Sequence, residues 1–177
     1  MAPAVMNGYP LSPRIQFLAA VLEEMLVLVH DRAEALDLAV ARLLIEVETP
    51  VPDPQRIVAA WDHALAALVA LDGGCAGGPL PALVFNQMLD PERVQRGPVD
   101  LCLALALEQA LELLPADPEL ANAIETLVLE CDKLHPDRME IELAQLFAGE
   151  ALARMAEDGS GGALAFLLVE WLRSRGA

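Results

Sequence analysis

The chain has 177 residues and a formal net charge of −16, from 27 acidic and 11 basic side chains. Such a negative field repels phosphate backbones and anionic lipid headgroups, so we expect neither nucleic acid nor a membrane surface as a partner. Hydrophobic residues make up 55% of the chain but aromatic residues only 4%. A core of Leu, Ala, Val and Met favours helices over sheet. We therefore predict an all-α protein, a compact bundle of about six to eight helices, with a solenoid of helix pairs as the alternative.

The cysteines and the N-terminus bear on the cellular compartment. Cys75, Cys102 and Cys131 are far apart and odd in number, and the sequence contains no CxxC motif. The first ten residues lack the basic and apolar regions of a signal peptide. Together these features predict free thiols and a cytoplasmic protein. No stretch of the sequence is long and apolar enough to suggest a transmembrane helix.

The N-terminal third of the chain contains its longest periodic segment. Residues 1–11 are rich in Pro, Gly and Asn and predict an irregular arm, which precedes a single helical domain over residues 12–177. In Ser12–Glu48, apolar residues recur at steps of three and four, which predicts a long N-terminal helix around which the others pack. The polar run His30–Arg32 near its middle indicates either a kink or a break into two helices.

Shorter helices follow, separated by Pro-rich and Gly-rich segments. We expect them over residues 53–72, 82–89, 99–114, 117–134, 139–157 and 163–174. An Asp-Pro-Gln/Glu sequence occurs at residues 53, 90 and 117, and Asp before Pro is typical of a helix N-terminus. The segment Leu101–Leu107 is apolar on all sides, so it is predicted to be buried on most sides or to lie in an oligomer interface.

The densest group of ligand-type side chains is Glu130–Asp137. Asp132 and His135 are three residues apart, a spacing that lets two side chains of one helical turn hold a metal ion. Cys131 falls on the same apolar stripe as the core residues of its helix, which favours a structural role for the segment. We therefore expect no metal and no cofactor, and keep Asp132 and His135 as the candidates for a metal site.

Arg56 and His63 form a second candidate pair, with six residues between them. An Arg-x(4–6)-His pattern on a helix resembles the motif of HEPN-type ribonucleases, which are also helical bundles. The resemblance covers these two positions and implies a nuclease-type enzyme. The run between them lacks the polar residue that usually follows the Arg in that motif.

A longer similarity lies in Leu134–Phe147. This segment resembles the region around the Pro-x-Asp-His-Leu pattern of TorD/NarJ-type chaperones, which are acidic, all-helical cytoplasmic proteins that escort redox enzymes. The matching positions here are Pro136, Asp137, Glu142 and Leu143, whereas Arg138 stands where the family places His. The resemblance implies a chaperone for redox-enzyme maturation.

Our leading functional hypothesis is a non-catalytic binding protein: an adaptor, a specific chaperone or an immunity-type inhibitor. Its acidic charge and abundant apolar helix surface suit recognition of a basic or amphipathic protein segment. The predicted partner-binding side chains are the acidic residues of the N-terminal helix, Glu23, Glu24, Asp31, Glu34 and Asp37. The competing hypotheses are a small enzyme that uses Asp132 and His135 or Arg56 and His63, and a homodimer with Leu101–Leu107 near its two-fold axis.

Overall fold

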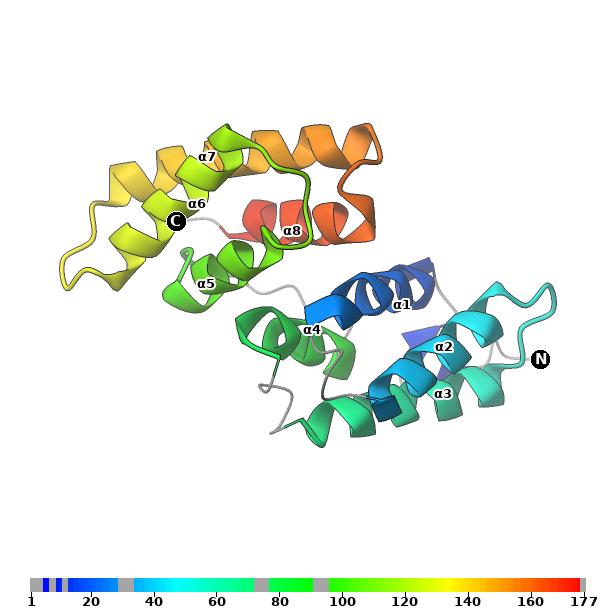
Figure 1. Ribbon diagram of the computed structural model, residues 1–177. Helices are drawn as coiled ribbons and strands as arrows, with labels where there is room; N and C mark the ends of the chain where they lie inside the picture. The colour runs from blue at the N-terminus through cyan, green and yellow to red at the C-terminus, as the bar shows by residue number, and fades with distance from the viewer. Residues whose placement is uncertain are drawn as a thin grey trace. The chain divides into compact units, whose positions relative to one another are not determined.

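The computed structural model confirms an all-α fold (Figure 1). It describes residues 5–6, 9–10, 13–28, 34–71, 77–90 and 96–175. Within these ranges, no helix is both long and apolar enough to cross a membrane. The α-helices are α1 Pro13–Met25, α2 Glu34–Glu48, α3 Pro54–Val69, α4 Pro79–Leu89, α5 Leu101–Ala110, α6 Pro118–Asp132, α7 Arg138–Glu157 and α8 Gly162–Ser174.

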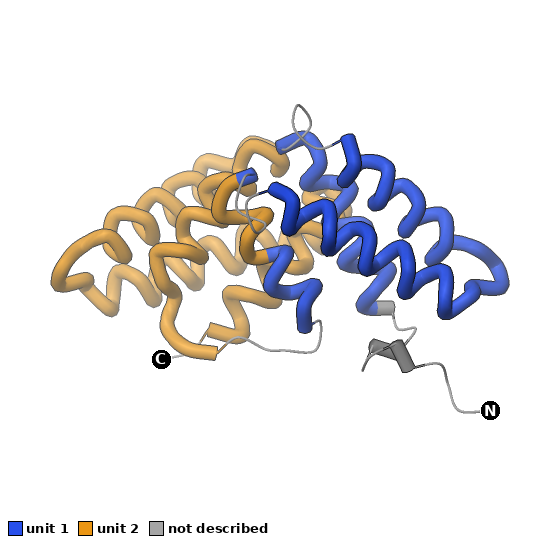
Figure 2. Tube along the Cα trace, turned by 90° about the horizontal axis from the view of Figure 1, so that it is seen from below, with its two compact units in different colours: residues 1–77, 84–93 blue, residues 78–83, 94–177 orange. Residues whose placement is uncertain are grey.

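The helix contacts divide the chain into two compact units (Figure 2). Unit 1 comprises Met1–Gly77 and Val84–Arg93, and unit 2 comprises Gly78–Leu83 and Val94–Ala177. The sequence alone predicts one helical domain over residues 12–177, and the contact pattern separates that range into two parts that we describe individually.

The predicted long N-terminal helix consists of two helices that pack against each other in unit 1. α1 continues into a short 3-10 turn, η1, at Leu26–Leu28, and α2 begins at Glu34. A continuous helix over Ser12–Glu48 is therefore wrong, because its two halves could not then contact each other. The predicted break at His30–Arg32 lies outside the described residues, between the two helices.

Unit 1 also contains α3, which packs against α2, and the part of α4 from Val84 to Leu89. The apolar stripe predicted for the N-terminal segment faces inward, because Leu18, Leu22 and Leu43 are all buried. The side-chain amide of Gln16 donates a hydrogen bond to the Val47 carbonyl at 3.1 Å, which ties α1 to the last turn of α2. In the N-terminal arm, two-residue strands β1 (Val5–Met6) and β2 (Tyr9–Pro10) pair antiparallel.

Unit 2 is built from α5, α6, α7 and α8. α7, its longest helix, contacts both α6 and α8, and α6 also contacts α5. The apolar segment Leu101–Leu107 lies in α5, where Leu103, Ala104, Ala106 and Leu107 are buried while Cys102 is exposed. Most sides of this segment are thus already covered in the single chain.

The Asp-Pro sequences cap helices as predicted. The Asp53 carboxylate accepts a hydrogen bond from the Gln55 backbone N–H at 2.9 Å, at the start of α3. Asp117 accepts from the Leu120 N–H at 3.0 Å, at the start of α6. Each carboxylate satisfies a donor that the first helical turn leaves without a partner. The third such sequence, at residue 90, runs into residues 91–95, which lie outside the described residues.

We expect Gly161→Ala to destabilise unit 2, because Gly161 is buried in the turn between α7 and α8. A Cβ atom there would lie 2.5 Å from the Ala165 Cβ and 3.0 Å from the Met155 Cβ, and neither atom can rotate away. Overpacking of this kind costs about 1–3 kcal/mol. Urea unfolding monitored by circular dichroism measures the change.

The matched control is Gly149→Ala, in the interior of α7. A Cβ atom there meets nothing within 4 Å, and Ala is favoured over Gly in a helix by up to about 1 kcal/mol. Gly149→Ala should therefore raise the free energy of unfolding where Gly161→Ala lowers it. Equal effects of the two substitutions would contradict the packing described for the α7–α8 turn.

Candidate docking face on α7

The segment Glu130–Asp137 comprises the last residues of α6 and the connection to α7, and Glu130 holds that connection in place. The Glu130 carboxylate is buried, accepts a hydrogen bond from the Lys133 ammonium group and accepts a second from the Asp137 backbone N–H at 3.0 Å. The hydrogen bond from Lys133 lowers the pKa of Glu130 below its ordinary value, and that from Asp137 adds to the effect. Both hydrogen bonds are made to the charged form. Glu130 therefore has a structural role in this connection.

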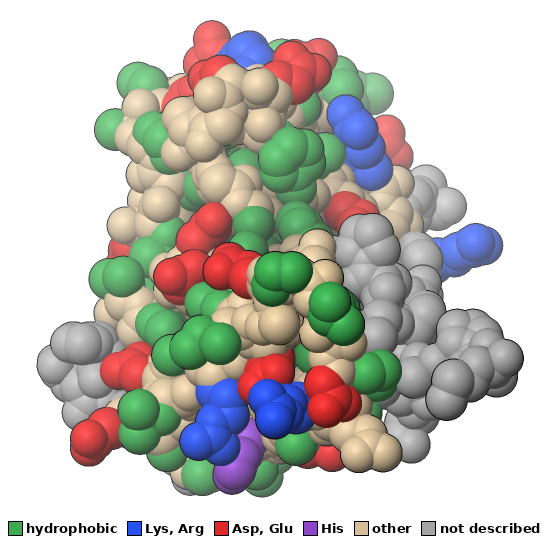
Figure 3. All heavy atoms as spheres, turned by 90° about the vertical axis from the view of Figure 1, so that its right-hand side faces the viewer, with side chains coloured by type: hydrophobic (Ala, Val, Ile, Leu, Met, Phe, Trp, Pro, Cys, Tyr) green, Lys and Arg blue, Asp and Glu red, His purple; other side chains and the backbone are tan. Residues whose placement is uncertain are grey.

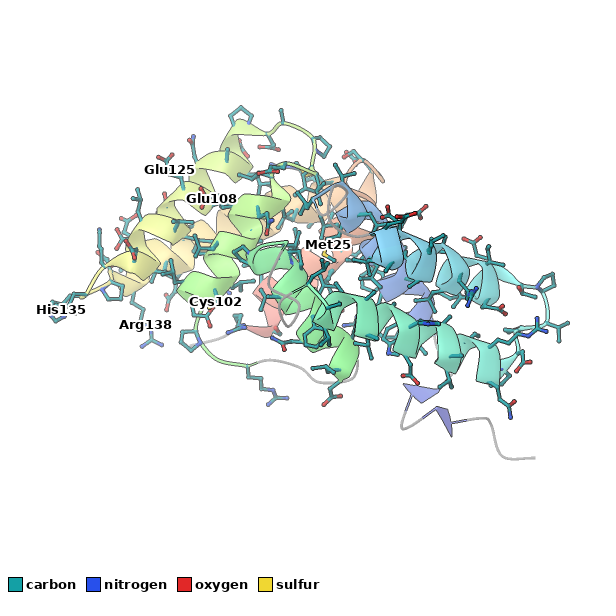
Figure 4. All side chains as sticks on the ribbon, turned by 60° about the horizontal axis from the view of Figure 1, so that its bottom comes forward. Met25, Cys102, Glu108, Glu125, His135 and Arg138 are labelled. Carbon is teal, nitrogen blue, oxygen red and sulfur yellow. The ribbon has the colours of Figure 1, made fainter. Side chains whose placement is uncertain are left out.

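The two candidate metal ligands lie at the exposed end of this connection. Asp132 and His135 are both exposed, and Figure 4 shows His135 at the tip, directed away from the helices. Within the described ranges, no group of three or more His, Cys, Asp or Glu side chains is arranged to share a metal ion. Asp132 thus ends α6 and His135 lies in the connection that follows, and no third ligand from the described residues is arranged beside them.

Cys131 is half-buried on α6, and its Sγ lies 3.6 Å from the Val99 carbonyl oxygen, which accepts its hydrogen bond. Burial raises the pKa of the Cys131 thiol, and the nearby carboxylates of Asp100 and Glu130 raise it further. A protonated, half-buried thiol is a poor nucleophile and metal ligand. This agrees with the predicted packing role of Cys131. Cys75 lies outside the described residues.

Arg56 and His63, the pair that resembles the HEPN motif, both lie exposed on α3. The Arg56 Nε is 3.7 Å from the Asp53 carboxylate at the helix N-terminus. His63 lines a groove between α2 and α3 together with Arg42, and Arg56 does not line that groove. The nuclease interpretation stays a prediction.

The acidic side chains predicted to bind a partner differ in exposure. Glu23 and Glu34 are exposed, whereas Glu24 and Asp37 are half-buried. Asp31 lies outside the described residues. The role of this group in partner binding stays a prediction. A more specific candidate surface lies on α7 in unit 2.

The candidate surface is the outward face of α7, on which large apolar side chains are exposed to solvent. Met139, Leu143, Leu146 and Phe147 are between 43% and 70% exposed. Their spacing of four, three and one residues places them on one side of the helix. The opposite side is buried and consists largely of small residues, Ala144, Ala148 and Ala151. We call the four exposed side chains the α7 face.

A groove runs along each side of the α7 face. The α6/α7 groove has a volume of about 600 Å³, and the apolar side chains Leu143 and Phe147 line it. The α7/α8 groove has a volume of about 460 Å³ and is lined by Leu146 and Leu172 among others. At its end the Gln145 amide donates to the carbonyls of Leu172 and Arg175, both at 2.7 Å, which fixes the C-terminus of α8.

Carboxylates surround the α6/α7 groove. Its charged lining residues are Glu119, Glu140, Glu150 and Arg154. The Arg154 guanidinium donates to the Glu119 carboxylate at 2.9 Å, so the one cation of the lining is already paired with an acid. A helix groove with exposed Leu and Phe side chains and an excess of carboxylates is suited to bind a basic amphipathic segment.

Comparisons with protein-family models, curated proteins and solved structures find no match to this chain.

The pH dependence of stability tests the role of Glu130. Because the pKa of Glu130 in the folded chain is below its ordinary value of 4.5, unfolding takes up a proton in acid. Its contribution to stability is complete above the unfolded pKa and is lost as the pH falls through the folded pKa. We expect Glu130→Gln to destabilise the protein at neutral pH and to have a progressively smaller effect in acid.

Urea unfolding curves at a series of pH values measure this difference. The control is Glu125→Gln, an exposed glutamate of the same helix (Figure 4). If Glu130→Gln kept the wild-type pH profile, or if Glu125→Gln changed it equally, the anchoring role of Glu130 would be wrong.

Proposed function

We propose that this protein is a non-catalytic helical binding protein that recognises a basic, amphipathic segment of another protein through the α7 face. An adaptor, a specific chaperone and an immunity-type inhibitor each bind a segment of another protein without catalysing a reaction. The observation that carries the proposal is the exposure of Leu143, Leu146 and Phe147 beside an acidic groove. Contiguous exposed apolar surface with a polar border is typical of an interaction site.

The apolar face supplies binding free energy. Full burial of a Leu, Met or Phe side chain is worth about 1.5–3 kcal/mol. The four side chains of the α7 face are about half exposed on average, so a partner that covers them recovers on the order of 1 kcal/mol from each. The sum is a few kcal/mol, which is enough for a reversible complex when charged contacts add to it.

The carboxylates select the partner. A helix that lies in the α6/α7 groove would place apolar side chains, spaced three and four residues apart, against Leu143 and Phe147. Its flanking Lys or Arg side chains would meet Glu140 and Glu150 at the border of the groove. Opposite charges of this kind increase the association rate and disfavour acidic partners.

The TorD/NarJ-type interpretation is a special case of the specific-chaperone version. Of the four positions that match the family pattern, Pro136 and Asp137 directly precede α7, and Glu142 and Leu143 lie within it. Asp137 is the N-cap of that helix and accepts from the Met139 N–H at 2.9 Å. Leu143 belongs to the α7 face. We keep the redox-enzyme chaperone as the second candidate function, and the membership of Leu143 in the α7 face supports it.

We expect Phe147→Ser to weaken binding of a synthetic amphipathic peptide that has Leu at helix positions i, i+3, i+4 and i+7 and Lys elsewhere. Loss of one aromatic anchor should reduce the affinity at least about tenfold. Isothermal titration calorimetry gives the dissociation constant, and affinity should fall with added salt because the carboxylates attract the Lys side chains.

The matched control is Phe166→Ser, since Phe166 on α8 has the same 54% exposure as Phe147 but lines neither groove. This variant should bind like the wild type. A second control is a peptide of the same composition in scrambled order, which keeps the charge and loses the apolar side. Equal binding of both peptides, or equal loss in both variants, would show that α7 is not the docking face.

A further inference from the structure

The groove in unit 1 that His63 lines differs from the α6/α7 groove in its charge. It lies between α2 and α3 and has a volume of about 820 Å³. Two large side chains at its border are exposed, Leu38 at 67% and Ile45 at 66%. The rest of its apolar lining is small and consists of Ala35, Ala39, Ala41, Ala66, Ala67 and Ala70. Figure 3 shows a face of the molecule on which hydrophobic side chains lie beside basic side chains, a histidine and acidic side chains.

The shape of this groove suits a helix as its occupant. Leu38, Arg42 and Ile45 follow one another at steps of four and three residues, so they form a ridge along α2. The alanines beside this ridge form a furrow, because their side chains project little from the helices. A ridge of one helix packs into the furrow of another at close interaxial distance.

The charged side chains that line the groove point to a second copy of α2 as the helix that occupies it. The ionisable side chains of the groove are Arg42, Glu46 and His63, so basic and acidic groups are balanced here although the whole chain carries −16. Arg42 and Glu46 lie one turn apart on α2. If two α2 helices pack antiparallel across a two-fold axis, each Arg42 faces Glu46 of the partner subunit, and the pattern is self-complementary.

We propose that the α2/α3 groove is a self-association surface, in which two copies of this chain pack their α2 helices antiparallel. The ridge of each copy fills the furrow of the other, and the two Arg–Glu pairs flank the two-fold axis. This surface lies in unit 1, whereas the α7 face lies in unit 2, so the two proposals can fail independently.

Sedimentation velocity over a range of protein concentrations tests the proposal. The wild type should show a monomer–dimer equilibrium, and Ile45→Glu should raise the dissociation constant at least about tenfold, because it places two carboxylates in the furrow. The control Val69→Glu changes an exposed side chain of α3 that does not line the groove, and it should dimerise like the wild type. A monomeric wild type, or equal effects of the two substitutions, would overturn the proposal.

Charge reversal tests the antiparallel arrangement itself. Arg42→Glu alone places two carboxylates opposite each other in each pair, and Glu46→Arg alone places two guanidinium groups there, so each should weaken the dimer. The double variant Arg42→Glu/Glu46→Arg restores opposite charges across the axis and should recover wild-type dimerisation. Arg42 is exposed and Glu46 is half-buried, and circular dichroism verifies that helix content is unchanged. A double variant as weak as the single variants would overturn the arrangement.

Discussion

The close approach of α6 and α8 to α7 is the constraint on which unit 2 depends. α7 contacts both helices, and the side chains that it buries include Ala144, Ala148 and Ala151. The distance between packed helices depends on the side chains at the contact, so alanine in these positions lets two neighbours approach one helix together. A larger residue at any of them would have to displace a neighbouring helix or adopt a strained rotamer.

This use of alanine determines what α7 presents to solvent. An ordinary surface helix buries its large apolar residues and exposes polar ones. The large buried side chains of α7, Leu152 and Met155, lie in its second half. In its first half α7 instead turns the small residues Ala144 and Ala148 inward, while Leu143, Leu146 and Phe147 remain in water. The free energy that these side chains would gain on burial is not used in folding the chain. It remains available for a partner, and this links the packing of unit 2 to the proposed function.

Periodicity and capping in the sequence predict most of the helices. Steps of three and four residues identify α3, α6 and α7 closely, and Asp53 and Asp117 cap helices as expected. The division of the N-terminal segment into α1 and α2 is one of two alternatives that its polar middle indicates. Such signals are local, so they specify where a helix begins and ends but not which neighbour it packs against.

The α7 face could not be predicted for the same reason. Both the alanines and the stripe from Met139 to Phe147 recur with helical spacing, and hydrophobicity alone assigns the larger residues to the core. Only the helices that pack against α7 determine which of the two stripes is buried. The cluster Glu130–Asp137 has a similar explanation: its composition resembles a ligand set, but the tight connection needs an acceptor for the Asp137 N–H, and Glu130 supplies it.

Net charge connects the two proposed surfaces and gives them opposite responses to salt. A basic peptide is attracted to a chain of charge −16, so screening weakens that complex. A second copy of the chain carries the same charge and is repelled at long range, so screening strengthens self-association even though the Arg42 and Glu46 contacts themselves become weaker. The repulsion acts between the net charges of two whole molecules, whereas the attraction acts between a few side chains such as Arg42 and Glu46. Two copies of the chain therefore meet at the lowest electrostatic cost where the groove between α2 and α3 has balanced charges.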